Sequence, residues 1–96
     1  QLDTISYAFR DFEHVLSACR LLQRHLPAGG RLYGYQGSYI LHFDPAGWPQ
    51  DVDMHAVVAI LSEYGEAASV TEAVLDEYGR VIIADDAVAV LCSRFG

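Results

Sequence analysis

Segments with the hydrophobic pattern of a strand alternate along this chain with segments that have the pattern of a helix. Residues 4–9 alternate in polarity and are rich in β-branched and aromatic side chains, which predicts a strand. Asp11 then offers a helix N-cap, and apolar residues recur with helical spacing from Phe12 to Leu26, before Pro27 ends the helix. The order of such segments leaves few possible topologies.

The remaining segments continue this alternation. Two strands are predicted at 32–35 and 39–43, with Gln36-Gly37-Ser38 as the turn of a hairpin. A second helix is predicted from Asp51 or Asp53 to Gly65. The rest of the chain predicts, in order, a fourth strand at 68–75, a bend at 77–80, a short strand at 81–83 and a last helix capped by Asp85 or Asp86.

This order predicts an α+β fold, a ferredoxin-like β-α-β-β-α-β sandwich with a short extra strand and a C-terminal helix. Two helices are expected on one face of a mostly antiparallel sheet. No Ser- or Pro-rich linker divides the 96 residues, so residues 1–96 are interpreted as a single domain. The fold itself does not determine a function, because it supports enzymes, RNA-binding modules, sensors and adaptors alike.

The charge of the chain restricts its partners. All six basic residues are arginine, and 13 acidic residues give a formal net charge of −7. Repulsion from phosphates argues against nucleic acid and against an anionic membrane, and favours a basic protein partner. No apolar run approaches the roughly 20 residues of a membrane span. Cys19 and Cys92 lie among apolar residues, which favours buried, reduced thiols and a cytoplasmic protein over a disulfide.

Sequence motifs of catalysis are missing from the chain. It has no nucleophile elbow, no phosphate-binding loop and no dinucleotide fingerprint. His42 and Asp44 would share a strand face, but a third metal ligand at a suitable spacing is missing. We therefore expect no enzyme, no catalytic residues, no cofactor and no metal site.

RNA binding is a weaker alternative. Residues 31–35, Arg-Leu-Tyr-Gly-Tyr, partly match the aromatic strand motif of RNA-recognition modules, in which alternate rings stack on bases. Leu32 replaces a glycine of that motif, Ser38 replaces an aromatic residue, and the net charge is unfavourable. Tyr33 and Tyr35 are expected to pack on one face of the sheet instead.

Two stretches of the sequence are near-copies of each other. They are Leu-Ser-Glu-Tyr-Gly at 61–65 and Leu-Asp-Glu-Tyr-Gly at 75–79, and we call them the Glu-Tyr elements. A carboxylate beside a tyrosine at an exposed bend suits a surface that binds an arginine- or lysine-rich partner. The alternative is that Gly65 caps a helix, Gly79 makes a turn, and the similarity is coincidental.

The sequence resembles the C-terminal domain of the MecA family. The resemblance covers nearly the whole chain, is most specific at 61–83, and rests on four stretches: 9–13, 39–44, 61–65 and 75–83. It implies a cytoplasmic adaptor domain that docks on a ClpC-type AAA+ unfoldase, promotes its assembly and activation, and delivers substrates to a ClpP-type protease in regulated proteolysis, including competence regulation. It also implies that a separate N-terminal domain, absent from this chain, recruits the substrates.

The resemblance places the family's docking positions on Glu63 and Glu77. Tyr64, Tyr78 and Asp76 adjoin them and complete the predicted partner-binding set. We expect Glu63 in the last turn of the second helix and Glu77 in the turn after the fourth strand, so that both belong to one acidic patch on one edge of the sandwich. The chain departs from the family at Gly65, where alanine is expected, and in its lack of lysines.

A second hypothesis is a small-molecule sensor with the same sandwich fold, binding a metabolite at the sheet edge near Trp48. The Trp48 ring is expected to cover the open end of the core, and the alternative is an exposed interface anchor.

Overall fold

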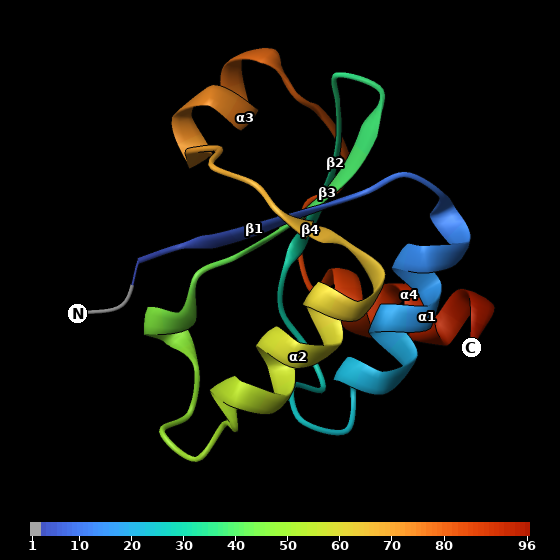
Figure 1. The fold of residues 1–96 in the computed structure, drawn as a ribbon, viewed down its shortest axis with the longest axis vertical. Coiled ribbons are helices and arrows are strands. Elements are labelled where there is room, and N and C mark those ends of the chain that lie inside the picture. Colours follow the sequence, from blue (N-terminus) through green and yellow to red (C-terminus); the bar gives the residue numbers. More distant parts are fainter. Residues whose placement is uncertain (1–2) are drawn as a thin grey trace.

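The computed structural model describes residues 3–96 and confirms the expected α+β architecture (Figure 1). Its elements are β1 (Ile5–Phe9), α1 (Phe12–Leu22), β2 (Arg31–Tyr35), β3 (Ser38–Phe43), a 3₁₀ turn η1 (Pro45–Gly47), α2 (Met54–Tyr64), β4 (Glu66–Ala67), α3 (Glu72–Tyr78), β5 (Arg80–Ile83) and α4 (Ala87–Phe95). The strands form one antiparallel sheet in the order β4-β1-β3-β2-β5. The first four have the ferredoxin-like order, and β5 is the extra strand.

Both faces of the sheet are covered by helices. Leu32 and Leu41 are register partners on the face that packs against α1, α2 and α4, where the main core lies. Their neighbours Tyr33 and Ile40 point to the opposite face, because side chains alternate along a strand, and there they pack with Leu75 of α3. The prediction of two helices on one face is therefore incomplete: three helices cover one face and α3 covers the other (Figure 1).

The predicted helix starts are confirmed in position, and their capping differs. At α2, the side chain of Asp53 accepts a hydrogen bond from the backbone N–H of Ala56 at 3.1 Å. Asp11 is the N-cap residue of α1, but its side chain makes no capping hydrogen bond. Asp86 precedes α4 in the left-handed conformation, with φ +50°. The first N–H groups of α4 donate instead to the carbonyl oxygens of Gly29 and Gly30.

The predicted fourth strand at 68–75 is wrong, because β4 (Glu66–Ala67) lies just before that range and no residue from 68 to 75 is in a strand. Strand β4 has only two residues, and pairing with β1 ends at Ala68, whose N–H donates to the carbonyl oxygen of Ser6 at 2.9 Å. Helix α3 begins after Thr71, whose hydroxyl accepts from the N–H of Val74 at 3.2 Å. Polar capping and the burial of Leu75 thus outweigh the strand preference of the β-branched residues around them.

The cysteines are free thiols, as predicted. Cys19 is fully buried. The thiol of Cys92 donates a hydrogen bond to the backbone carbonyl oxygen of Cys19 at 3.4 Å. Burial raises the pKa of Cys19 to about 12. Trp48 packs edge-on against Phe43, with ring centroids 5.8 Å apart, and adjoins the main core, as expected for a ring that covers its open end.

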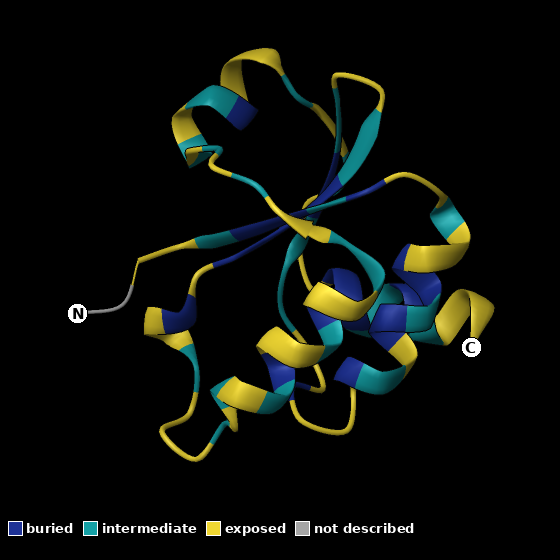
Figure 2. Ribbon diagram, in the orientation of Figure 1, coloured by how far each residue is buried: buried dark blue, intermediate teal, exposed yellow. Residues whose placement is uncertain are grey.

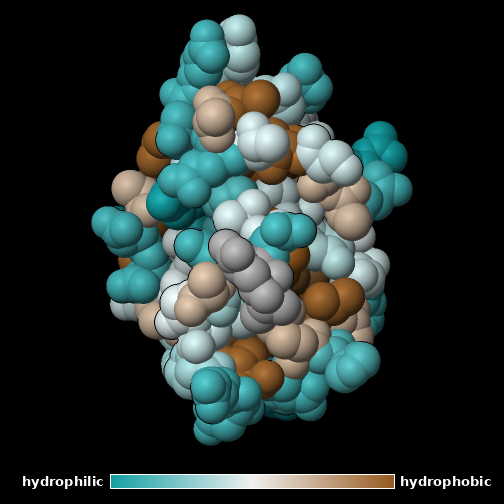
Figure 3. Space-filling model, turned by 90° about the vertical axis from the view of Figure 1, so that its left-hand side faces the viewer, coloured by the Kyte–Doolittle hydropathy of each residue, from teal (hydrophilic) through white to brown (hydrophobic). Residues whose placement is uncertain are grey.

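Exposed hydrophobic side chains are scattered. The large ones among residues 3–96 are Val58, Tyr78, Val81 and Phe95, and Tyr78 is the most exposed of them at 69%. On the side shown in Figure 3, hydrophobic residues form separate groups between hydrophilic ones. Within the described part of the chain, every helix is too short or too polar to cross a membrane.

Candidate functional site

The two Glu-Tyr elements have the same local structure, because each is the C-terminal end of a helix. Helix α2 ends at Tyr64 and α3 ends at Tyr78, and the glycine that follows donates its N–H to the leucine carbonyl, Gly65 to Leu61 and Gly79 to Leu75, each at 2.8 Å. Both leucines are fully buried. Each element therefore has a buried leucine anchor beneath an exposed glutamate. The two elements are thus similar in structure as well as in sequence.

Neither glycine is needed for a left-handed backbone, since φ is −141° at Gly65 and −83° at Gly79. Gly65 instead allows close packing: a Cβ there would lie 2.8 Å from the carbonyl oxygen of Ala8 and 2.8 Å from the ring of Phe9. Glycine at position 65, where the family resemblance leads us to expect alanine, thus allows a tight contact between the end of α2 and strand β1.

The elements lie at one end of the sheet. We call it the hairpin end: it comprises the last residue of β1, the turn between β2 and β3, and the start of β5. Phe9 pairs with Tyr39 beside that turn, and Arg80 pairs with Gly34. Gly65 packs on Phe9, and Gly79 directly precedes Arg80. Both helix ends therefore reach the hairpin end.

The sheet separates the two glutamates, and this corrects the prediction of one acidic patch. Glu63 belongs to α2, whose buried side chains join the main core, whereas Glu77 belongs to α3 on the opposite face (Figure 1). Glu77 lies in the last turn of α3 and not in a turn after a strand. The glutamates thus flank the hairpin end from its two sides.

The five predicted partner-binding residues differ in their accessibility. Glu63, Asp76, Glu77 and Tyr78 are exposed, and Tyr64 is half-buried against the main core (Figure 2). The carboxylate of Asp76 accepts a hydrogen bond from the hydroxyl of Tyr33 at 3.3 Å, so it helps to hold α3 on the sheet. Glu63, Glu77 and Tyr78 are therefore the members that are free to contact a partner.

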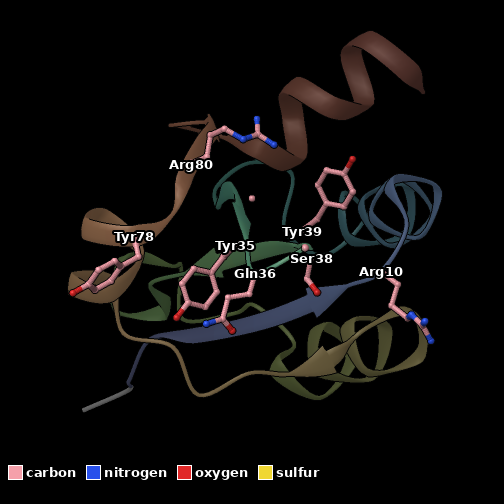
Figure 4. Close-up of a pocket in the computed structure, with 9 residues that line it drawn as sticks. Arg10, Tyr35, Gln36, Ser38, Tyr39, Tyr78 and Arg80 are labelled. Carbon is pink, nitrogen blue, oxygen red and sulfur yellow. The ribbon is translucent and has the colours of Figure 1, made fainter.

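A hollow of about 490 Å³ at the hairpin end separates Tyr78 from Arg10 (Figure 4). Residues of the β2–β3 turn and Arg80 line it as well. Arg10 also borders a second hollow, of about 380 Å³, beside Glu63 and His14. Within residues 3–96, Arg10 and Arg80 take part in none of the ion pairs. Sequence reasoning missed these two arginines as site residues, because only strand pairing brings them to this end of the sheet. The hairpin end therefore carries positive as well as negative side chains.

Ion pairing and hydrogen bonding fix α3 over the sheet. Nη1 of Arg31 donates to Oε2 of Glu72 at 2.9 Å and to the hydroxyl of Tyr33 at 3.1 Å. The hydrogen bond to Tyr33 has the larger effect and the one to Glu72 the next, and together they raise the pKa of Arg31 above its ordinary value. Tyr33 is 1% exposed beneath α3, so its ring is not available to stack on bases. Arg31 and Tyr33 of the partial RNA-binding motif thus have a structural role.

Of the weaker metal candidates, His42 is buried and the side chain of Asp44 accepts from the N–H of Ala46 at 3.1 Å as the cap of η1. In the described residues, no group of three or more His, Cys, Asp or Glu side chains is arranged to hold a metal ion.

Comparison with known proteins gives consistent matches. The family model described as "Negative regulator of genetic competence (MecA)" matches residues 1–91. Adapter protein MecA 1 of Halalkalibacterium halodurans is 36% identical over 93 residues, which are 97% of this chain and 46% of that protein. Adapter protein MecA 2 of Bacillus subtilis is 35% identical over 91 residues, which are 95% of this chain and 45% of that protein. The chain thus spans slightly less than half the length of these relatives.

Solved structures match over almost their full length. The C-terminal domain of YpbH superposes with a TM-score of 0.82 at 33% identity, covering 97% of this chain and 99% of that one. The C-terminal domain of MecA gives 0.81 at 26% identity, covering 97% and 98%. A chain from a cryo-EM study of the MecA–ClpC complex gives 0.78 at 28% identity, covering 100% and 99%.

Proposed function

The chain belongs to the MecA family, and we propose that it is an adaptor domain that docks on a ClpC-type AAA+ unfoldase. By docking it promotes assembly and activation of the unfoldase, which then passes substrates to a ClpP-type protease. The observation that carries this proposal is the pair of Glu-Tyr helix ends, each with an exposed glutamate above a fully buried leucine. A similar chain forms part of a MecA–ClpC complex. The role is binding rather than catalysis.

The helix ends are suited to binding a basic partner. A glutamate in the last turn of a helix lies near the negative end of the helix dipole, where a carboxylate is disfavoured, so Glu63 and Glu77 do not serve helix stability. The buried leucines hold both helix ends in place before binding, which lowers the entropic cost of docking. Because the glutamates lie on opposite faces, the partner contacts both sides of the hairpin end.

Charge reversal tests the proposal. The variants Glu63→Lys, Glu77→Lys and the double variant are compared for co-elution with a ClpC-type unfoldase, with and without ATP, and for stimulation of its ATPase. We expect each single variant to weaken both and the double variant to abolish them, with an unchanged far-UV CD spectrum. Full stimulation by the double variant would refute docking through these residues.

We further propose that residues 1–96 act as a single domain and that a separate N-terminal domain recruits the substrates. The full-length matches to C-terminal domains support the first part. The free thiols of Cys19 and Cys92 support a cytoplasmic location, where thiols stay reduced.

The small-molecule sensor remains a second hypothesis, because Trp48 borders two hollows. A thermal-shift screen with amino acids and nucleotides separates the hypotheses, since a ligand that binds only the folded state raises its melting temperature.

A further inference from the structure

A buried histidine on the α3 face has one nitrogen without a partner. His42 is 2% exposed, and its Nδ1 lies 2.6 Å from the hydroxyl of Ser6. Its Nε2 has no hydrogen-bond partner among residues 3–96. The nearest carboxylate atom, Oε1 of Glu72, is 3.9 Å away, which is beyond hydrogen-bonding distance. Buried polar atoms are nearly always satisfied, so a partner from outside the chain is needed to complete the hydrogen bonding of this nitrogen.

The hydrogen bonds of Ser6 define which kind of partner Nε2 requires. The Ser6 hydroxyl has one proton, and it lies 3.3 Å from the carbonyl oxygen of Val70, which only accepts. Both contacts of Ser6 are used when it donates to Val70 and accepts from the N–H of His42 Nδ1. In that tautomer Nε2 carries a lone pair. Burial lowers the pKa of His42, more than the nearby Glu72 raises it, so the ring is neutral at pH 8. The missing partner is therefore a hydrogen-bond donor.

His42 lines a hollow of about 240 Å³ at the end of the sheet opposite the hairpin end, which we call the Trp48 hollow. Its lining residues include four carboxylates, those of Asp44, Glu72, Asp85 and Asp86, and one cation, Arg31. Arg31 is already paired with Oε2 of Glu72, which leaves Oε1 on the side of His42. The Trp48 hollow thus has an excess of negative charge as well as an unused acceptor.

Trp48 provides the third element of a site. Its ring borders the hollow and is half-buried against Phe43, so it is held in place. An aromatic ring attracts a cation and packs against an alkyl chain. Acceptor, carboxylates and ring together match a cation that carries N–H donors on an aliphatic stem.

We propose that the Trp48 hollow binds a primary alkylammonium group, which donates hydrogen bonds to Nε2 of His42 and Oε1 of Glu72 and packs its stem beside Trp48. An ammonium group has three N–H donors and no acceptor, so it satisfies the lone pair and the carboxylate together. The group comes from a small amine or from a lysine side chain of a protein. This site is separate from the docking surface at the hairpin end.

Fluorescence of Trp48, the single tryptophan of the chain, reports on the hollow directly. The protein is titrated at pH 8 and constant ionic strength with n-butylammonium and with Nα-acetyl-lysine N-methylamide, which represent the two sources. The matched control is butyltrimethylammonium, which keeps the charge and has no N–H. We expect a saturable change with one or both primary amines and none with the quaternary control. An equal response to the quaternary ion, or only linear changes with both amines, would overturn the proposal.

Two variants test the geometry of the site. Glu72→Gln and Asp86→Asn each remove one charge from the hollow, and Asn tolerates the left-handed backbone of Asp86. We expect Glu72→Gln to weaken amine binding about tenfold or more and Asp86→Asn to weaken it less, while Glu63→Gln, with the same change in charge at the other end, has no effect. Far-UV CD verifies folding. Equal amine affinity in all three variants would contradict the site.

Discussion

Replacing Leu75 with alanine tests how α3, and with it Glu77, is held on the sheet. Leu75 is the one fully buried side chain of α3 and packs against Tyr33 and Ile40. A buried Leu→Ala substitution costs about 2–5 kcal/mol, and the cost is smaller where the surroundings can close around the cavity. Helix α3 is short and covers its face alone, so we expect a loss at the lower end, about 2–3 kcal/mol.

The matched control is Leu61→Ala, at the same position of the other Glu-Tyr element. Leu61 is equally buried, but it lies in the main core between helices and sheet, where closing the cavity is harder. We expect its loss to be larger, about 3–5 kcal/mol. Urea unfolding gives both values.

Amide exchange then shows where each variant opens. In Leu75→Ala, exchange should accelerate mainly in residues 72–78, because the main core on the other face keeps its contacts. In Leu61→Ala, protection should fall in α1 and α2 as well. The reasoning is refuted if Leu75→Ala costs as much as Leu61→Ala, or if it lowers protection uniformly across the chain.

Three further predictions concern glycine packing and ionisation. Gly30→Ala places a Cβ 2.5 Å from the ring of Phe43 at φ +85°, and should cost about 1–3 kcal/mol more than Gly37→Ala, which has φ +79° and open space, as measured by urea unfolding. Gly65→Ala should also lower the free energy of unfolding by about 1–3 kcal/mol, because the new Cβ would collide with strand β1. An unchanged melting temperature would contradict this close contact. The pKa of Cys19 is raised from 9.0 to about 12, so the folded state favours the neutral thiol, and this contribution to stability is full below pH 9 and is lost as the pH rises to 12. Between pH 9 and pH 12 the free energy of unfolding should therefore fall by up to about 1.4 kcal/mol per pH unit, and the Cys19→Ala variant should not show this fall.

Local signals in the sequence predicted most of the fold. Asp53 and Gly65 mark the ends of α2, and Gly37 marks the β2–β3 turn, because capping and turn preferences act within a few residues. Helix α3 was missed because Val70, Thr71 and Val74 are β-branched and favour a strand locally. Its helical state depends on Leu75 packing beneath it on Tyr33, a contact between distant parts of the chain that no local pattern contains.

In the candidate site, too, local features were predictable from the sequence and features that depend on long-range contacts were not. Exposure of Glu63 and Glu77 followed from their position before a glycine at a helix or turn end. Their separation by the sheet did not, because it depends on α3 crossing to the other face. The arginines Arg10 and Arg80 were missed for a related reason: the pairing of Phe9 with Tyr39 and of Arg80 with Gly34 brings them to the hairpin end.

The affinity of the charge-reversed double variant for a ClpC-type unfoldase tests the central claim most directly. Its control is the double variant Asp3→Lys and Asp51→Lys, which makes the same change in net charge at exposed positions away from the hairpin end and from the Trp48 hollow. Losing one partner of a desolvated charge pair costs about 2–5 kcal/mol, and two such losses on opposite faces should be nearly additive. We therefore expect the Glu63→Lys, Glu77→Lys protein to lose measurable binding while the control binds like the wild type. Equal affinities of the two double variants would contradict docking through the Glu-Tyr helix ends.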